Sequence, residues 1–133
     1  MEEVKKMHNI KQIAKITGLS ASTLRYYENE QLLTDVQRDD NGVRIYSEED
    51  LSLIRFVKCL RSTNMPIAEI KRYMSLYSHG SETLCERKQI MLTQKRRVEQ
   101  MIKQLEHSLE TINFKISLYE MEEEELQQRG LRI

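Results

Sequence analysis

Tryptophan, proline and glycine are scarce in this chain of 133 residues, which contains no tryptophan, one proline and four glycines. Proline and glycine are the residues that most often interrupt helices, so their scarcity favours long helices. No run of 18 apolar residues occurs, and the sequence therefore predicts no membrane-spanning helix. The polar start of the chain lacks the apolar stretch of a signal peptide. We expect a cytoplasmic protein that does not enter a membrane.

An excess of charge of either sign is also lacking. The chain has 21 lysines and arginines and 21 aspartates and glutamates, so its formal net charge is zero although 32% of its residues are charged. The protein is therefore not a general polycation. Any contact with nucleic acid must come from the local placement of arginines and lysines.

Residues that bind metals or catalyse reactions are few and scattered. The three histidines, His8, His79 and His107, lie far apart in the sequence, and no nucleophile elbow, phosphate-binding glycine loop or HExxH pattern occurs. The two cysteines, Cys59 and Cys85, are expected to be reduced thiols in a cytoplasmic protein. Zinc takes four ligands and copper(I) at least two, so one thiolate makes no closed site. We expect no catalytic residue, no metal and no cofactor.

Two short helices separated by a glycine turn are predicted between residues 10 and 30. Gly18 can adopt the left-handed conformation that ends a helix, and Ser20 can cap the next one. In this second helix, Leu24 and Tyr27 are predicted to face the first. The pattern is typical of a helix-turn-helix. The outer faces of the second helix are then left to Thr23, Arg25 and Tyr26.

A small hairpin and two further helices are predicted next. The Asp40-Asn41-Gly42 segment favours a tight turn because asparagine and glycine tolerate positive φ, and the flanking residues alternate as strands do. This predicts a two-stranded wing. Ser47 followed by three acidic residues predicts the start of a helix that ends near Ser62, and Pro66 opens another helix at its first position.

From Ser81 onward no residue interrupts the helix until Gly130. Apolar residues recur at heptad positions, which is the pattern of a coiled-coil seam. One long helix cannot bury such a stripe alone, so we expect a homodimer. Lys88 and Lys95 interrupt the seam near its start, where the helix can rest against the amino-terminal domain instead. The predicted seam residues are Leu84, Met91, Val98, Ile102, Leu105, Leu109, Ile112, Ile116 and Tyr119.

The predicted fold is mainly α, with a winged helix-turn-helix head and a long dimerisation helix. Residues 7–78 form the head, residues 79–120 the coiled-coil helix and residues 121–133 an acidic, mobile tail. An α-helix fits the major groove of DNA, a wing can contact the flanking backbone, and the first helix of the pair usually crosses the backbone. The residues predicted from these patterns to bind DNA are Lys11, Thr23, Arg25, Tyr26, Arg38, Arg44 and Tyr46.

Two other interpretations stay open at this point. The arginines of a small helical domain can be merely solvated, and a coiled-coil adaptor without DNA binding would explain the last third of the chain. An adaptor leaves the Arg25-Tyr26 pair and the wing unexplained. Salt dependence separates the classes, because a DNA-binding protein loses affinity steeply as salt rises and an adaptor shows no such binding.

The stretch from Ile10 to Tyr77 resembles the amino-terminal domain of the MerR family of bacterial transcription regulators. The matching segments are IKQIAKITGLSASTLRYYE, NGVRIYSEEDL and FVKCLRSTNMPIAEIK. The resemblance implies an antiparallel coiled-coil dimer that binds double-stranded promoter DNA and distorts an over-long spacer, so that RNA polymerase can use both promoter elements. By position it also implies that Arg61 is a backbone contact. Gln31 and Asn64 stand where the family often has glycine, and Thr34-Asp35 where proline is frequent.

Cys59 is the predicted sensor. Arg55 precedes it by four residues, and positive charge near a thiol favours the reactive thiolate. A small buried hydrophobe beside Phe56 and Leu60 is the alternative. The chain is also similar to the AdhR/NmlR-like branch of the family, which responds to aldehyde and thiol stress, has a cysteine at this place and lacks an effector domain. This implies a covalent reaction of Cys59 with electrophiles such as aldehydes. Cys85 is the competing thiol, and a non-thiol small-molecule effector stays open.

Overall fold

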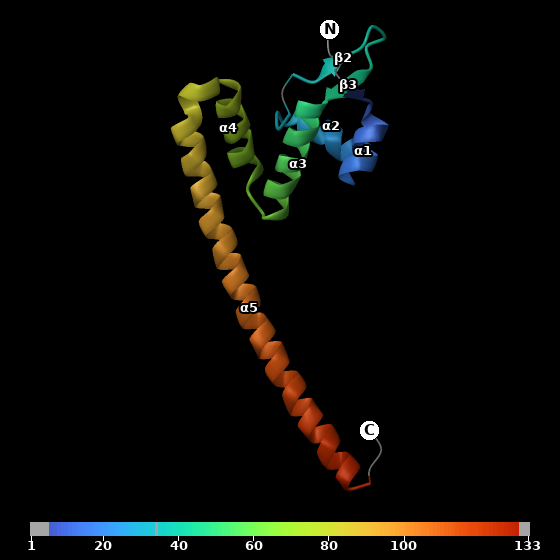
Figure 1. Ribbon diagram of the computed structural model, residues 1–133, viewed down its shortest axis with the longest axis vertical. Helices are drawn as coiled ribbons and strands as arrows, with labels where there is room; N and C mark the ends of the chain where they lie inside the picture. Colours follow the sequence, from blue (N-terminus) through green and yellow to red (C-terminus); the bar gives the residue numbers. More distant parts are fainter. Residues whose placement is uncertain (1–5, 34, 131–133) are drawn as a thin grey trace. The chain divides into compact units, whose positions relative to one another are not determined.

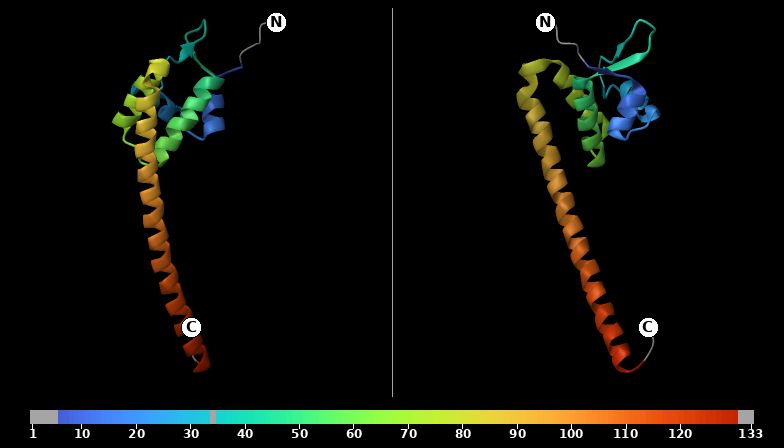
Figure 2. Two further views of the ribbon diagram at one scale, coloured as in Figure 1. Left: turned by 60° about the vertical axis from the view of Figure 1, so that its left-hand side comes forward. Right: turned by 45° about the vertical axis from the view of Figure 1, so that its right-hand side comes forward.

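A computed structural model describes residues 6–33 and 35–130. The chain divides into two compact units, one up to Met91 and one from Leu92 onward. Helices predominate beside a small antiparallel sheet, which confirms the predicted fold class (Figure 1 and Figure 2). The elements are β1 (Met7–His8), α1 (Ile10–Thr17), α2 (Ala21–Asn29), β2 (Gln37–Arg38), β3 (Arg44–Ser47), α3 (Glu48–Ser62), α4 (Ile67–Ser78), the 3₁₀ turn η1 (Gly80–Thr83) and α5 (Leu84–Gln128).

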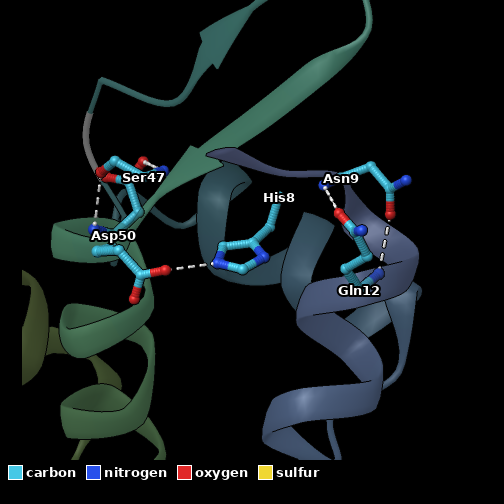
Figure 3. A network of polar contacts seen from close by, with 6 residues as sticks. His8, Asn9, Gln12, Ser47 and Asp50 are labelled. Atoms are coloured by element: carbon cyan, nitrogen blue, oxygen red, sulfur yellow. Dashed lines mark hydrogen bonds and ion pairs between the residues drawn. The ribbon is translucent and has the colours of Figure 1, made fainter. Parts of the chain in front are cut away.

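Side-chain caps fix the two helices of the helix-turn-helix. The Asn9 side chain accepts a hydrogen bond from the Gln12 backbone N–H, and the Gln12 side chain accepts one from the Asn9 N–H, each at 2.8 Å (Figure 3). Gly18 ends α1 with a left-handed φ of 76°, and Ser20 caps α2 by accepting from the Thr23 N–H at 3.1 Å. Both helix starts and the turn therefore follow from local chemistry.

A lysine from α3 completes the cap of α1. The Lys58 ammonium donates to the carbonyl oxygen of Thr17 at 2.5 Å, and Thr17 in turn donates its hydroxyl to the Ile13 carbonyl at 2.7 Å. A cation at a helix carboxyl end is stabilised by the unpaired carbonyls there. This contact joins the last turns of α3 to the turn between α1 and α2.

The predicted two-stranded wing is part of a three-stranded sheet with the order β1-β3-β2. In its turn, the Asp39 side chain accepts from the N–H groups of Asn41 and Val43, both at 2.9 Å. The register places Arg38 opposite Arg44 and His8 opposite Tyr46. The sequence did not indicate β1, because a strand of two residues carries no readable alternation.

His8 connects β1 to the start of α3. Its ring is buried, and its Nε2 lies 2.7 Å from a carboxylate oxygen of Glu48 (Figure 3). This hydrogen bond holds the pKa of the Glu48 carboxyl below its usual range. Beside it, Ser47 and Asp50 form the capping box that begins α3 at the predicted residue. The hydrogen bond between His8 and Glu48 therefore links β1 to the first turn of α3.

One hydrophobic core fills the first unit. It draws buried side chains from α1, α2, β3, α3 and α4, including Ile13, Leu24 and Ile54, each with no exposed surface. The inner face of α3 consists of Leu51, Ile54, Val57 and Leu60, whereas Phe56 is half-buried and packs on Tyr73 with ring centroids 5.6 Å apart. Ile90 and Met91 from the first turns of α5 also pack against this core, as expected for the start of the long helix.

Two helix ends adopt glycine-like turns without glycine. Gln31 after α2 has a φ of 62°, and Asn64 after α3 has a φ of 63°. In both turns the next residue, Leu32 or Met65, is fully buried and donates its N–H to a carbonyl five residues back. This is the Schellman arrangement, in which a buried apolar residue secures the turn. Burial of Leu32 and Met65 thus offsets the cost of a left-handed non-glycine residue. The other departure from the family pattern begins at Thr34, which lies outside the described residues.

The helix α5 continues through the acidic segment to Gln128. The prediction that the helix gives way to a tail at residue 121 is therefore wrong as far as residue 128, and residues 131–133 lie outside the described part. Glutamate and glutamine are good helix formers, so a run of acids does not by itself end a helix. Gly130, with a φ of 72°, stands beyond the end. No helix of the described residues is long and apolar enough to cross a membrane.

Candidate nucleic-acid interface

The helix α2, which is the second of the predicted helix-turn-helix, divides its residues into a buried and an exposed face as predicted. Leu24 is fully buried and Tyr27 is 6% exposed, whereas Tyr26 is 45% exposed and Arg25 lies on the surface. Burial raises the pKa of the Tyr27 hydroxyl, against a smaller opposite effect of the nearby Arg61. Thr23 is half-buried, and its hydroxyl lies 2.9 Å from that of the capping Ser20. The outward face of α2 therefore offers Arg25 and Tyr26 to a partner.

Two further predicted contacts come from neighbouring helices of the same unit. Lys11 is exposed on α1, which packs directly against α2. Arg61 is half-buried near the end of α3, where its guanidinium donates to the Met65 carbonyl at 2.8 Å. Arg61 thus stabilises the turn after α3, and its contact with a DNA backbone stays a prediction.

The wing reaches the recognition helix through an ion pair. Arg44 donates from Nε to a carboxylate oxygen of Glu28 at 2.5 Å, and the two side chains are 27% and 22% exposed. Arg38 is exposed, and its guanidinium donates to the Gly42 carbonyl at 2.9 Å across the hairpin turn. The Arg44–Glu28 pair places the wing and α2 on one continuous surface.

Tyr46 lies in the core and not on the wing surface. Its side chain has no exposed area, so the prediction that it contacts DNA is wrong. Alternation along β3 turns Arg44 and Tyr46 to the same side, and that side packs against the helices. The hydroxyl has no hydrogen-bond partner within residues 6–33 and 35–130. Burial raises its pKa, the Glu28 charge adds to the rise, and the Arg44 and Arg25 charges oppose it.

Glu28 and Lys58 are the interface residues that the sequence did not single out. Glu28 ends the LRYYE segment, and an acid on a helix expected to face phosphates needs a neutralising partner. This need for a partner could have drawn attention to Glu28 from the sequence alone. It does not decide whether the partner is Arg25, three residues away on the same helix, or Arg44. The contact of Lys58 with α1 spans 41 residues, and no local pattern indicates it.

The predicted seam on α5 is exposed along its second half. The seam residues from Ile102 to Tyr119 are between 47% and 69% exposed in the single chain. Leu84 is 58% exposed, and Val98 is half-buried. Met91 differs, because its packing against the core of the head accounts for its apolar side chain without a partner chain. The uncovered stripe is therefore the segment Ile102, Leu105, Leu109, Ile112, Ile116 and Tyr119.

Comparison with known protein families identifies the chain. Residues 8–76 match the family model described as "MerR HTH family regulatory protein". Residues 51–113 match a second family model, described as "MerR, DNA binding". The chain belongs to the MerR family. This assignment confirms the predicted resemblance and places the chain among regulatory proteins and not among enzymes.

Similar proteins agree with the MerR assignment. The regulator AdhR of Bacillus subtilis is 42% identical over 68% of this chain, although the match spans only 64% of that relative. A crystal structure of HiNmlR, a MerR family regulator lacking the sensor domain and bound to promoter DNA, covers 95% of this chain and 97% of its own, at 29% identity and a TM-score of 0.82. A MerR family structure from Listeria monocytogenes covers 92% and 96% at 31% identity and a TM-score of 0.85.

Both thiols of this MerR-family chain are free and exposed. The alternative that Cys59 is a buried hydrophobe is therefore wrong. Cys59 lies on α3 next to Lys58, which binds the turn after α1, and two residues before Arg61, which binds the turn after α3. Cys85 is in the first turn of α5. Within residues 6–33 and 35–130 no three histidine, cysteine or acidic side chains gather as a metal site would need.

Replacing Tyr46 tests its reassignment to the core. We expect Tyr46→Phe to leave the free energy of unfolding unchanged or raised by up to about 1 kcal/mol, because it removes a buried hydroxyl without a partner. Tyr46→Ala should lower it by about 3–5 kcal/mol, since a large buried ring is lost. Chemical denaturation measures both. A Phe variant that folds as well as the wild type but binds DNA poorly would instead support direct contact by the hydroxyl.

Proposed function

We propose that this MerR-family chain is a sequence-specific transcription regulator that binds double-stranded promoter DNA as a homodimer. The observation that carries the proposal is the surface formed by α2 and the wing, on which Arg25 and Tyr26 are exposed and Arg44 is bound to Glu28. A helix of this kind can enter the major groove while the wing contacts the flanking phosphates. The alternative of a coiled-coil adaptor does not explain why Arg25 and Tyr26 are exposed beside the wing.

The dimer is proposed from α5. A stripe of six exposed apolar residues from Ile102 to Tyr119 favours pairing with a second helix. Charge along the same helix supports antiparallel pairing. Lys95, Arg96 and Arg97 lie near one end of the stripe and residues 122–125, all glutamates, lie beyond the other. Parallel helices would place like charges together, whereas antiparallel helices crossing near Leu109 place the basic run of each beside the acidic run of the other.

Two heads joined in this way would occupy two half-sites on one promoter. The family resemblance implies that the bound dimer distorts the spacer, so that RNA polymerase, which meets the regulator through the promoter, can use both elements. The crystal structure of HiNmlR bound to promoter DNA, which matches this chain over 95% of its length, supports the DNA-bound state. Whether the chain activates, represses or does both depends on its promoter.

The effector is proposed to be an electrophile that reacts with Cys59. The thiolate would add to the carbonyl carbon of an aldehyde while the carbonyl oxygen takes a proton, which gives a hemithioacetal. Support comes from the exposure of Cys59 and from its place between Lys58 and Arg61, whose hydrogen bonds fix the turns at the ends of α1 and α3. An adduct there would disturb the helix that positions the helix-turn-helix.

A non-covalent small molecule is the second candidate effector. A cleft of about 540 Å³ lies in the first unit, lined by residues that include Met7, Gln37, Leu53 and Tyr77. Pockets of about 300–1,000 Å³ commonly hold small ligands. The rim carries the acidic start of α3, Glu48–Asp50, and would therefore favour a cationic molecule.

Removing the recognition-helix arginine tests the DNA-binding proposal. Arg25→Ala should weaken specific binding by about 1–3 kcal/mol, the usual worth of a good base or charged phosphate contact. Fluorescence anisotropy with a labelled fragment of the promoter nearest the gene measures the loss. Lys103→Ala, which removes the same charge from an exposed site on α5, is the matched control and should bind like the wild type. Equal affinity of all three proteins would count against the docking of α2.

The thiol proposal is tested by transcription in vitro from the same promoter. A small aldehyde should change transcription with the wild type and with Cys85→Ser, and should have no effect with Cys59→Ser, because the reacting sulfur is gone. The Cys85→Ser variant controls for the general reactivity of thiols. A response that persists in Cys59→Ser but disappears in Cys85→Ser would move the sensor to Cys85. If the aldehyde does not change transcription even with the wild type, the thiol proposal fails and the non-covalent effector remains.

A further inference from the structure

We propose that Glu28 is a positioning residue for DNA binding, because it orients Arg44 so that the outer edge of the guanidinium faces a backbone phosphate beside the recognition helix. The proposal rests on the proposed function and goes beyond it by assigning a role to an acidic residue on a DNA-facing surface. In this proposal the ion pair between Glu28 and Arg44 holds the wing and α2 in a fixed relative position when they contact DNA.

The geometry of the pair leaves Arg44 able to bind a second anion. Only Nε donates to Glu28, at 2.5 Å. Arginine has five N–H donors in a rigid fork, so a bond through Nε leaves the four N–H groups of the terminal nitrogens. Within residues 6–33 and 35–130, neither terminal nitrogen of Arg44 makes a hydrogen bond. The terminal edge is the part of the fork that binds phosphate bidentately.

The surroundings hold the pair in one arrangement. Arg44 and Glu28 are 27% and 22% exposed, so water screens their attraction less than at an open surface. Tyr46 lies on the same side of β3 as Arg44 and is fully buried, and the charges of both Arg44 and Glu28 act on its hydroxyl.

The bond between Glu28 and Arg44 also means that Glu28 does not pair with Arg25 on its own helix. Glu28 lies three residues after Arg25, a spacing at which side chains on a helix can form an ion pair. In the structure Glu28 bonds to Arg44, and Arg25 remains exposed. One carboxylate thus fixes the wing arginine and leaves the helix arginine available to DNA.

Sequestration is the opposite interpretation, in which Glu28 competes with phosphate for Arg44. Competition would require the carboxylate to occupy the terminal fork that a phosphate needs. The Nε contact does not do so, and a phosphate can therefore bind while the Glu28 contact remains. The two interpretations predict opposite signs for the removal of Glu28.

The test is a double-mutant cycle between Glu28→Gln and Arg44→Ala, with DNA affinity measured over a series of salt concentrations. Removing an acid near DNA ordinarily strengthens binding, yet we expect Glu28→Gln to weaken it about tenfold, within the usual range for coupled residues. The slope of log affinity against log salt should become shallower by about 0.9, as for one lost phosphate contact. In the Arg44→Ala background Glu28→Gln should no longer weaken binding, and affinity should stay equal or rise slightly because an acid near DNA has been removed.

Control variants separate positioning from folding. Glu30→Gln removes a neighbouring acid and should bind as tightly as the wild type or slightly tighter. Arg44→Lys keeps the charge, but a lysine cannot bind Glu28 side-on and phosphate through a second edge, so it should lose affinity about as much as Glu28→Gln. Melting temperatures should match across the set, and a loss of affinity that tracks a lowered melting temperature would overturn the proposal.

Three other outcomes would also overturn it. Tighter binding by Glu28→Gln would show sequestration, and the salt slope would become steeper because the freed Arg44 gains a phosphate contact. Equal losses with and without Arg44 would show that Glu28 acts on something else. A wild type without salt-dependent DNA binding would refute the proposed function itself, and the wild-type titration, made first, distinguishes that failure from a failure of the positioning role alone.

Discussion

The packing of Leu24 and Tyr27 against the core is the constraint on which the rest of the candidate interface depends. These two side chains fix the rotation of α2, because they occupy its inward face. Arg25 and Tyr26 must then point outward, and Glu28, one residue after Tyr27, meets the wing at Arg44. The position of β3 depends on the same core, since Tyr46 on this strand is fully buried in it. Hydrophobic burial therefore sets the positions of the polar groups that we propose to meet DNA.

The parts of the fold that the sequence predicted are those with a local physical cause. Caps at Ser20 and Ser47 and the glycine turn at Gly18 act within one helical turn, and the structure confirms them. The missed parts depend on distant contacts. The strand β1 forms by pairing with the edge of β3. The burial of Tyr46 depends on the packing of β3 against α1, which precedes it in the chain, and against α3, which follows it. Alternation along β3 showed that Arg44 and Tyr46 share a side, but not that this side faces inward.

The two compact units carry different kinds of chemistry. The first, up to Met91, has a core of its own and supplies the helix-turn-helix, the wing and Cys59. The second is a single stretch of α5, whose apolar stripe is exposed among the described residues of one chain and is the surface on which we propose that a second chain pairs. Net charge does not distinguish the two units, because residues 1–91 contain 14 basic and 13 acidic side chains and residues 92–133 contain 7 and 8. Any contact with DNA therefore depends on the local placement of basic side chains such as the exposed Arg25.

The central claim is that two chains bind one promoter through this surface. Analytical ultracentrifugation of the wild-type protein with a labelled promoter fragment, at several salt concentrations, tests it most directly. We expect a complex of two chains per duplex whose affinity falls steeply as salt rises, because several phosphate contacts release counterions. A dimer that forms no complex with the fragment, or a complex of one chain per duplex that is indifferent to salt, would contradict it.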